Sequence, residues 1–319
     1  MIINFFAGDT KLAMFLGIIF AFALTCILLQ TMSKHLPKDL GRDFAHDGKL
    51  SAGKPRGAGF LFIIAFIIAS IFFIKLNNEL LIYLILVAAA MMTGFLDDCS
   101  RAPWGEYKKG LLDLAVAAMV AITFLNFNSN TIEIVSLGME VTIPPVIFGL
   151  LAIVLVWASI NVTNCTDGVD GLSGTLTIIT LMTIYMVSLI KKTDATFNYM
   201  TILFVISILA YLWYNATPSK LMMGDAGSRA MGLFISIAIL KTGRPILYIP
   251  AALVLILDGG LGLVKVALLR FLKIRILKNV RTPLHDQVRK VWGWSNTQAV
   301  FRFAIIQIMI GIAVVYMVM

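Results

Sequence analysis

The sequence predicts an all-α integral membrane protein that crosses the bilayer about ten times. Of its 319 residues, 60% are hydrophobic and only 13% are charged, whereas soluble domains average about 25% charged residues. The apolar residues come in blocks that are mostly about 17 to 22 residues long, the length a helix needs to cross roughly 30 Å of hydrocarbon. Because hydrocarbon offers the backbone no other hydrogen-bond partner, each block is expected to be helical. We interpret the whole chain, residues 1–319, as one polytopic domain.

The first apolar block is too long for the core of a signal peptide and has no small-residue cleavage site after it, so it is expected to be retained as a span. The remaining blocks follow at short intervals, joined by loops on alternating sides of the membrane. In chain order the ten blocks run over residues 11–33, 58–75, 80–96, 110–127, 143–161, 174–190, 198–214, 229–241, 247–268 and 299–318.

Two blocks contain residues that disturb a helix. The fifth begins at Pro144 and Pro145, a position where proline is tolerated. The ninth contains Pro250 and then Asp258 followed by two glycines, which together permit a kink or a break. A carboxylate at that depth is expected to face protein or water and not lipid.

Basic residues gather in three connecting segments, which indicates the orientation of the chain. The segments 34–57, 97–109 and 269–298 contain six, three and seven Lys or Arg residues, whereas the loops on the opposite side hold five in total. Lys and Arg accumulate in cytoplasmic loops. The three basic segments are therefore predicted to be cytoplasmic with both termini outside, and the net charge of +9 implies no nucleic-acid partner.

Two adjacent carboxylates, Asp97 and Asp98, close the third block. Neighbouring residues on a helix point about 100° apart, so one can bind a metal while the other contacts a substrate. Acids at the C-terminal end of a helix oppose its dipole, so a metal or the cations of Arg101, Lys108 and Lys109 are expected to compensate. The alternative is an ordinary solvated helix end.

A polar run over residues 161–172 follows the fifth block and contains two Asn, two Asp and two Gly. Asp167 and Asp170 are three apart and share a face if the run is helical. Gly168 and Gly171 allow a ligand or a backbone to approach closely. The alternative is a turn with a helix cap. The candidate binding residues of this run are Asn164, Asp167, Gly168 and Asp170.

The eighth block is preceded by Gly224-Asp225-Ala226-Gly227-Ser228. Magnesium takes carboxylate oxygens together with water and substrate phosphates, so Asp225 is a candidate metal ligand; the alternative is a helix cap.

Lys54 and Arg56 lie among glycines at the start of the second block. They can hold an anionic group; the alternative is that they serve only to orient the chain in the membrane. Acidic and basic side chains on the same side of the membrane are typical of a site for phosphoryl transfer. That reaction mainly requires positioning of the substrates and neutralisation of their charge.

Several of these motifs resemble the polyprenyl-phosphate N-acetylhexosamine-1-phosphate transferase superfamily, and the resemblance covers nearly the whole chain. Three motifs point to the superfamily as a whole, and three short stretches of the tail point to its muramoyl-pentapeptide branch. The superfamily motifs are Gly94–Asp98, Asn164–Leu172 and Met223–Ser228, and the tail stretches are Pro283–His285, Gly293–Ser295 and Val300–Phe303.

The resemblance implies a homodimer in the bacterial inner membrane, with ten spans, a cytoplasmic active site and a requirement for Mg²⁺. It implies transfer of phospho-MurNAc-pentapeptide from UDP-MurNAc-pentapeptide to the membrane lipid undecaprenyl phosphate, which forms lipid I and UMP in peptidoglycan synthesis. By position, Asp225 is the implied magnesium ligand, Asp97 the acid that deprotonates the lipid phosphate, and Asp98 its essential neighbour. The remaining positions implied to be catalytic or substrate-binding are His285, Lys108, Asn164, Asp167, Gly168, Asp170 and Asn215.

The chain departs from the superfamily pattern at several positions. It has His285-Asp286-Gln287 where three histidines are usual, Met222 where Phe is usual, and Lys265 where Gln is expected. Its first loop reads Gly-Lys-Pro-Arg-Gly-Ala-Gly over residues 53–59, where Gly-Thr-Pro-Thr-Met-Gly-Gly is usual. These positions bear on the identity of the sugar and on the role of His285, which as a lone histidine has a structural hydrogen bond as its alternative role.

Three alternative functions remain open at this point. The nearest is a sister enzyme that moves GlcNAc-phosphate from UDP-GlcNAc to the same lipid. A CDP-alcohol transferase is disfavoured because its longer acid-rich pattern is missing from the sequence. A membrane transporter is disfavoured because transporter acids usually lie near the bilayer midplane, whereas these acids are predicted at the cytoplasmic ends of the spans.

Overall fold

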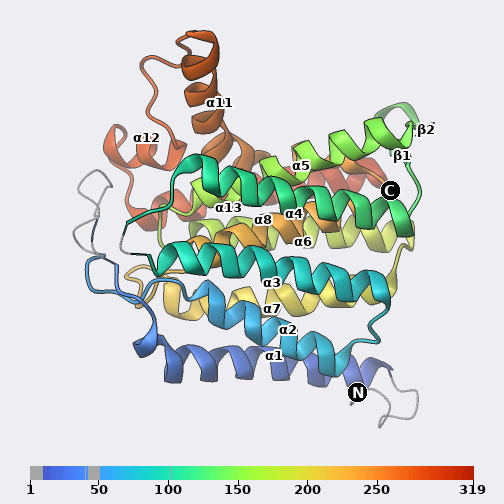
Figure 1. Cartoon of the computed structure of the whole chain (residues 1–319), viewed down its shortest axis with the longest axis horizontal. Coiled ribbons are helices and arrows are strands. Elements are labelled where there is room, and N and C mark those ends of the chain that lie inside the picture. The colour runs from blue at the N-terminus through green and yellow to red at the C-terminus, as the bar shows by residue number, and fades with distance from the viewer. Residues whose placement is uncertain (1–9, 40, 42–50, 101) are drawn as a thin grey trace.

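The protein is a bundle of long helices (Figure 1), and every apolar block predicted from the sequence is helical. The computed structural model describes residues 10–39, 41, 51–100 and 102–319. The long helices are α1 (Thr10–Met32), α2 (Gly59–Phe73), α3 (Asn78–Asp98), α4 (Glu106–Phe127), α5 (Pro145–Thr166), α6 (Leu172–Lys191), α7 (Ala195–Asn215), α8 (Gly224–Lys241) and α13 (Asn296–Val318). Short helical turns are η2 (Ser33–His35), η4 (Pro245–Leu247) and α12 (Leu284–Lys290).

Within the described residues, seven helices are long and apolar enough to cross a membrane, and the broken ninth block makes an eighth if it is taken as one span. The prediction of an all-α membrane protein is confirmed at this level. The one pair of strands in the described part of the chain is a hairpin that the sequence analysis did not foresee. It pairs β1 (Thr131–Ile134) with β2 (Met139–Thr142) in antiparallel register around η3 (Val135–Leu137).

The ninth block is broken, as its proline and glycines predict. Its parts Pro245–Ala251 and Leu253–Leu272 meet at an angle of 70°. The axis turns at Ala252, whose φ and ψ of −118° and 22° lie outside the helical range. The pieces are α9 (Tyr248–Ala251), α10 (Leu253–Leu255), the π-helical η5 (Ile256–Gly260), α11 (Leu261–Ala267) and the π-helical η6 (Leu268–Leu272).

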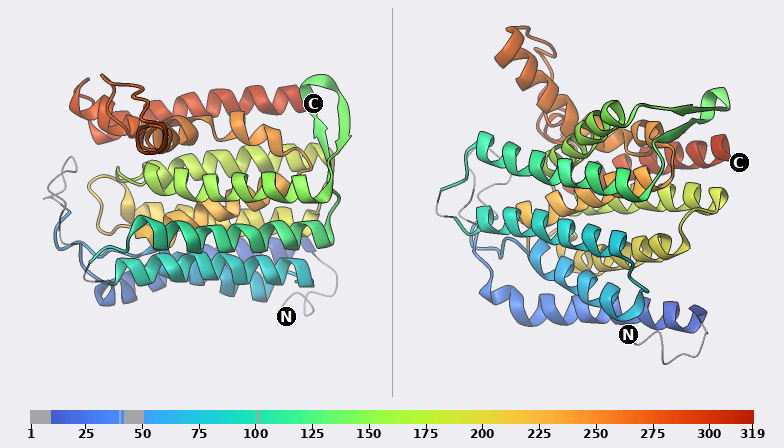
Figure 2. Two further views of the ribbon diagram at one scale, coloured as in Figure 1. Left: turned by 45° about the horizontal axis from the view of Figure 1, so that its top comes forward. Right: turned by 45° about the vertical axis from the view of Figure 1, so that its right-hand side comes forward.

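Parts of the basic segments lie at one end of the bundle and the β-hairpin lies at the other (Figure 2). The α3–α4 connection, α12 and the loop after η6, which belong to the basic segments, lie at one end. The β-hairpin, the start of α1 and the C-terminal end of α13 lie at the other. Three basic residues counted in the sequence, Arg42, Lys49 and Arg101, fall outside the described residues.

Close backbone approach holds α2, α3 and α8 together where the polar residues meet. A Cβ atom added to Gly59 would lie 2.0 Å from the backbone nitrogen of Gly227. A Cβ atom added to Gly94 would lie 2.4 Å from the carbonyl carbon and oxygen of Asp225. Both contacts are with backbone, which cannot rotate away as a side chain can. Glycine at these two positions therefore lets the first turn of α8 pack directly on α2 and α3.

We expect Gly94→Ala to lower stability by about 1–3 kcal/mol, the usual cost of overpacking, because α3 must move away from α8. Gly110→Ala is the matched control, since Gly110 also lies in a helix but has no atom within 4 Å of an added Cβ. That control should be neutral or stabilising by up to about 1 kcal/mol. Thermal unfolding of both variants in one detergent measures the difference, and equal melting temperatures would contradict the proposed close packing.

Candidate active site

The first turn of α8 is capped by a carboxylate from another helix. The two oxygens of Asp98 accept hydrogen bonds from the backbone N–H groups of Asp225 (3.2 Å) and Ala226 (3.1 Å). An acid is favourable there because it meets unpaired N–H groups and the positive end of the helix dipole. Gly224 has a φ of +68° and would place a Cβ atom 2.2 Å from Asp98, so glycine is required for this contact. Asp98 thus determines where Asp225 lies.

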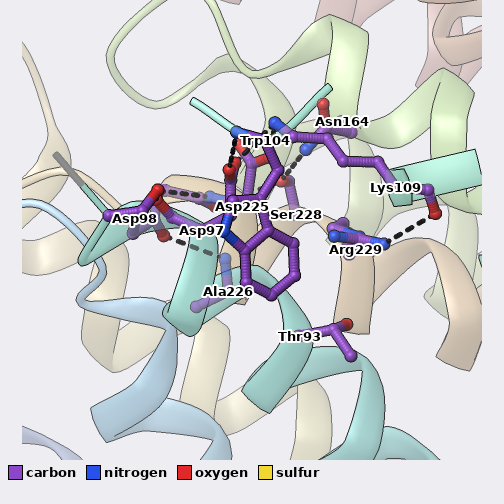
Figure 3. A network of polar contacts seen from close by, with 12 residues as sticks. Thr93, Asp97, Asp98, Trp104, Lys109, Asn164, Asp225, Ala226, Ser228 and Arg229 are labelled. Carbon is purple, nitrogen blue, oxygen red and sulfur yellow. Dashed lines mark hydrogen bonds and ion pairs between the residues drawn. The ribbon is translucent and has the colours of Figure 1, made fainter. Parts of the chain in front are cut away.

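One ammonium group joins the other two acids (Figure 3). The Nζ atom of Lys109 lies 2.5 Å from Asp97 and 2.9 Å from Asp225. Asp97 also accepts a hydrogen bond of 2.7 Å from the backbone N–H of Trp104, which ties the α3–α4 loop to the end of α3. Carboxylates from α3 and α8 and an amine from α4 therefore converge on one point.

Arg56 lies on the other side of the same acids. Its guanidinium contacts Asp98 at 2.9 Å, Asp225 at 3.6 Å and Asp39 at 3.6 Å. Its loop lies against Met222, whose N–H donates to the Pro55 carbonyl at 2.8 Å. Burial would lower the pKa of Arg56, but the surrounding carboxylates, Asp98 first, raise it above its ordinary value. Arg56 is therefore a permanent cation inside the acid cluster.

A pocket of about 470 Å³ opens beside this cluster. It is lined by residues from the first loop, the α5–α6 turn, the end of α7 and the start of α8, so it is assembled from segments far apart in the sequence. Asn164 donates a hydrogen bond of 2.9 Å to Ser228 across it. The predicted site residues that line the pocket are Asn164, Asp167, Gly168, Asp170, Asn215 and Asp225.

The segment 167–171 is a turn between α5 and α6, not a helix. The helical face that Asp167 and Asp170 would share is therefore not formed, although both residues line the pocket. Asp170 accepts the backbone N–H of Ser219 at 3.1 Å and lies 4.0 Å from Lys54. Asn215 accepts the N–H of Gly171 at 2.8 Å and donates to the Leu221 carbonyl at 2.9 Å. These bonds hold the turn against the loop before α8.

His285 lies behind this turn and is paired with the buried acid of the broken block. Its ring Nδ1 lies 2.8 Å from one oxygen of Asp258, and its backbone N–H donates to the other at 2.6 Å. Asp258 is fully buried, so the expectation that this carboxylate faces protein is confirmed. The ring edge carrying Nε2 faces Gly168, where an added Cβ atom would lie 2.3 Å away. His285 does not line the pocket.

The residues after His285 bring a buried guanidinium to the pocket. Asp286 accepts hydrogen bonds from Arg289 (3.1 Å) and Lys290 (2.8 Å). Burial favours the neutral acid, but the hydrogen bonds from Lys290 and Arg289 outweigh it and lower the pKa of Asp286. Arg289 lines the pocket and bonds to the Gly168 carbonyl at 3.4 Å. In the sequence alone, Arg289 stands only among the basic residues that indicate topology.

Comparison with known proteins finds a matching family model and several similar sequences. Residues 80–243 match the family model described as glycosyl transferase family 4. The chain is 36% identical over 315 residues to the phospho-N-acetylmuramoyl-pentapeptide-transferase of Treponema pallidum, covering 93% of this chain and 85% of the relative. It is 24% identical over 273 residues to the enzyme of that name from a Wolbachia of Drosophila simulans, covering 81% and 82%. The chain belongs to the phospho-N-acetylmuramoyl-pentapeptide-transferase family.

The resemblance implies a substrate-binding role for Lys108, whereas the structure places its neighbour Lys109 against the acids. The Nζ atom of Lys108 lies 3.3 Å from the centre of the Trp104 ring, and Lys108 is exposed. Lys109 is the residue that contacts Asp97 and Asp225. Both lysines lie in the first turn of α4. Which of them reaches the acids depends on which side of that turn faces α3.

The donor set fits a hard divalent cation, although no group of three or more His, Cys, Asp or Glu side chains in the described residues converges to hold one. Among the described residues, the cations in contact with these acids are Arg56 and Lys109, and the acids are Asp97, Asp98, Asp225 and Asp39. In these contacts carboxylates outnumber cations. Magnesium commonly binds through one or two carboxylates plus water and substrate phosphates, which matches Asp225 at the pocket wall.

A buried ion pair joins α8 to α4 one helical turn further into the bundle than Asp225 and Lys109. Arg229 contacts Asp113 through Nε at 3.0 Å and also through Nη2, and its Nη2 bonds to the Lys109 carbonyl at 3.4 Å. Both side chains are almost fully buried. Since Asp225 and Arg229, and Lys109 and Asp113, are each four residues apart, the two ion pairs stack along the α4–α8 contact. The sequence analysis did not single out either Arg229 or Asp113.

We expect Arg229→Met and Asp113→Leu, made singly, each to cost about 3–5 kcal/mol of stability, because each leaves a buried charge without its partner. The double variant should recover most of that loss, since apolar residues of similar volume often replace a buried pair at little cost. Arg270→Met is the control: it breaks an exposed pair with Glu106 and should leave the melting temperature unchanged. A double variant as unstable as the sum of the singles would contradict the pairing.

Proposed function

We propose that this chain transfers phospho-MurNAc-pentapeptide from UDP-MurNAc-pentapeptide to undecaprenyl phosphate, forming lipid I and releasing UMP. The observation that carries the proposal is the convergence of Asp97 and Asp225 on Lys109 beside a polar pocket. Such an arrangement suits two phosphate-bearing substrates that must be brought together and neutralised. The name of the Treponema pallidum relative supports the choice of sugar donor.

We further propose that the whole chain is one domain with ten spans in the bacterial inner membrane, and that it works as a homodimer. This count adds the 15-residue α2, α8 and the broken ninth block to the seven helices that meet the length and composition criteria for crossing a membrane. The basic loops at the pocket end favour a cytoplasmic active site and termini outside. The pocket then faces the nucleotide sugar, and the ends of α3 and α8 face the lipid phosphate at the inner leaflet.

We assign distinct roles to the three acids. Asp97 lies at the junction of α3 and its loop and is proposed to accept the proton of the lipid phosphate or to orient that phosphate. Asp225 is proposed to bind Mg²⁺, which when bound neutralises the diphosphate and the departing UMP. Asp98 acts through Asp225, because both of its oxygens are used by the α8 backbone.

The reaction we propose is a single in-line displacement. An oxygen of the lipid phosphate attacks the β-phosphorus of the UDP-sugar, and the bond from that phosphorus to the bridging oxygen breaks, so UMP leaves. Arg56 and Lys109 stabilise the negative charge that builds up on the phosphoryl oxygens and orient them. Asn164, Asp167, Asp170 and Asn215 are proposed to shape and contact the nucleotide-sugar pocket, and His285 to support the turn that carries Asp167 and Gly168.

Purified protein should release UMP from UDP-MurNAc-pentapeptide when undecaprenyl phosphate and Mg²⁺ are both present. Chelation of the metal should abolish the release, because the pyrophosphate is then not neutralised. Release from UDP-GlcNAc instead would assign the chain to the sister reaction. Uptake of either compound into vesicles without UMP release would indicate a transporter.

We expect Asp225→Asn to reduce UMP release by at least about a hundredfold, because metal neutralisation of transferring phosphate contributes several kcal/mol. The variant should also require more Mg²⁺ for half-maximal activity. The measurement is a magnesium titration of UMP release for parent and variant. Full activity with an unchanged titration curve would remove Asp225 from the metal site.

Lys109→Gln should lower the rate by roughly a hundredfold, the usual loss for removal of one group that stabilises a developing anion. Lys108→Gln makes the same chemical change one residue away. Because Lys108 contributes a single exposed cation–π contact, its loss should change the rate by no more than about fivefold. Kinetic constants for both variants decide the assignment, and the reverse order of effects would show that Lys108 is the functional lysine.

A further inference from the structure

Two cations of the acid cluster contact different oxygens of Asp225. The Nζ atom of Lys109 lies 2.9 Å from Oδ2, whereas Nη2 of Arg56 lies 3.6 Å from Oδ1. Arg56 is among the residues that line the pocket, and Lys109 is not. Of these two cations, Arg56 is therefore the one placed to leave Asp225 for a molecule bound in the pocket.

The contact between Arg56 and Asp225 is the loose end of the guanidinium. The Nη1 atom lies 3.6 Å from Asp39 and Nη2 lies 3.6 Å from Asp225, both beyond the usual range of an N–H···O hydrogen bond. The Nε atom is closer to its acid, at 2.9 Å from Asp98. Asp98 accepts two backbone N–H groups of α8, and Asp39 accepts the Ser51 hydroxyl at 2.6 Å. Asp98 and Asp39 are thus fixed by other bonds, so Arg56 can exchange Asp225 while Nε stays anchored.

The backbone that carries Arg56 is held on both sides. The N–H of Arg56 donates to the Pro37 carbonyl at 2.7 Å. The N–H of Met222 donates to the Pro55 carbonyl at 2.8 Å, and the N–H of Ala58 donates to the Met222 carbonyl at 3.0 Å. An exchange of partners at Arg56 therefore needs rotation of its side chain only, and the adjacent pocket of about 470 Å³ leaves room for that rotation.

The charge at this position distinguishes the chain from the pattern that it resembles. The first loop reads Gly-Lys-Pro-Arg over residues 53–56, where Gly-Thr-Pro-Thr is usual. Threonine offers a neutral hydroxyl, which does not compete with a metal cation for a carboxylate. A guanidinium beside Asp225 does compete, because both are positive and both are attracted by the same carboxylate.

We propose that Arg56 competes with the divalent cation for Asp225, so that metal binding is weak without the donor and is strengthened by the donor diphosphate. This inference rests on the proposed role of Asp225 as the metal ligand. When the metal binds, Arg56 gives up Asp225 and keeps Asp98. Its Nη groups then donate to phosphate oxygens, which suit the fork of a guanidinium. Because the diphosphate is the new partner of Arg56, each of the two ligands favours binding of the other.

The first test measures metal binding with no substrate present. Mn²⁺ alone is titrated into the purified full-length protein, and electron paramagnetic resonance measures the free ion. Arg56→Gln and Arg56→Thr should each bind Mn²⁺ at least about tenfold more tightly than the parent, the effect of one charge within a few ångströms of a carboxylate. The control Lys54→Gln removes a charge from the same loop, but Lys54 lies beside Asp170 at 4.0 Å. Its loss should change the affinity by no more than about threefold.

The Asp225→Asn variant separates the two ways in which this test can fail. If Asp225→Asn loses Mn²⁺ binding while both Arg56 variants bind it no more tightly than the parent, the competition is disproved and the metal assignment stands. Arg56 would then only hold the acids in place. If Asp225→Asn binds Mn²⁺ as the parent does, Asp225 is not the ligand, and the assignment fails together with the inference.

The second test follows Arg56 in the unaltered protein. Phenylglyoxal modifies guanidinium groups, and mass spectrometry of the digested protein measures the modified fraction at each arginine. Mn²⁺ alone should raise the modified fraction of Arg56, because its contact with Asp225 is given up, and UDP added with the metal should reverse that rise. Arg270 is the internal reference, since it pairs with Glu106 and does not line the pocket. Protection of Arg56 by Mn²⁺ alone, or no change, would overturn the proposal. Neither test uses transferase activity, so each reports on Arg56 whichever sugar the enzyme transfers.

Discussion

The start of α8 is the constraint on which the site depends. Its first N–H groups have no partner in their own helix, and the carboxylate of Asp98 at the end of α3 supplies one. Gly59 and Gly94 bring α2 and α3 close enough for this bond to form. Because Asp225 is part of the capped turn, the contact that closes the bundle also sets the position of the proposed metal ligand.

In the contacts of the described residues around this turn, carboxylates outnumber cations, which agrees with the proposed chemistry. Four carboxylates there contact two cations in a region with little solvent. Carboxylates brought this close repel one another unless cations lie between them. Arg56 and Lys109 supply part of that positive charge from the protein, and a bound divalent cation would supply more. Binding of substrate would then replace internal ion pairs by contacts to phosphate.

Two buried polar contacts support the site from within the bundle. Arg229 and Asp113 connect α8 to α4 one turn from Asp225 and Lys109, and Asp258 connects the broken block to His285. Charges in an apolar bundle are expensive unless they are paired. Each pair therefore favours one register of its two segments. The Arg229–Asp113 pair sets the register that brings Lys109 to the acids. The Asp258–His285 contact places His285 behind the turn that lines the pocket.

The sequence by itself determined the membrane class, the helical blocks and the break in the ninth block, and it predicted acids that the structure brings together at the start of α8. These follow from hydrophobic block length, from proline and glycine, and from the clustering of carboxylates at one end of the spans. Only the tertiary structure decided which of Lys108 and Lys109 meets the acids, that residues 167–171 form a turn, and that Asp98 caps α8. It also revealed the β-hairpin, the Arg229–Asp113 pair and the absence of buried residues in α11. Local sequence encodes the length and polarity of each segment, whereas these features depend on the angle and register at which segments distant in the chain meet.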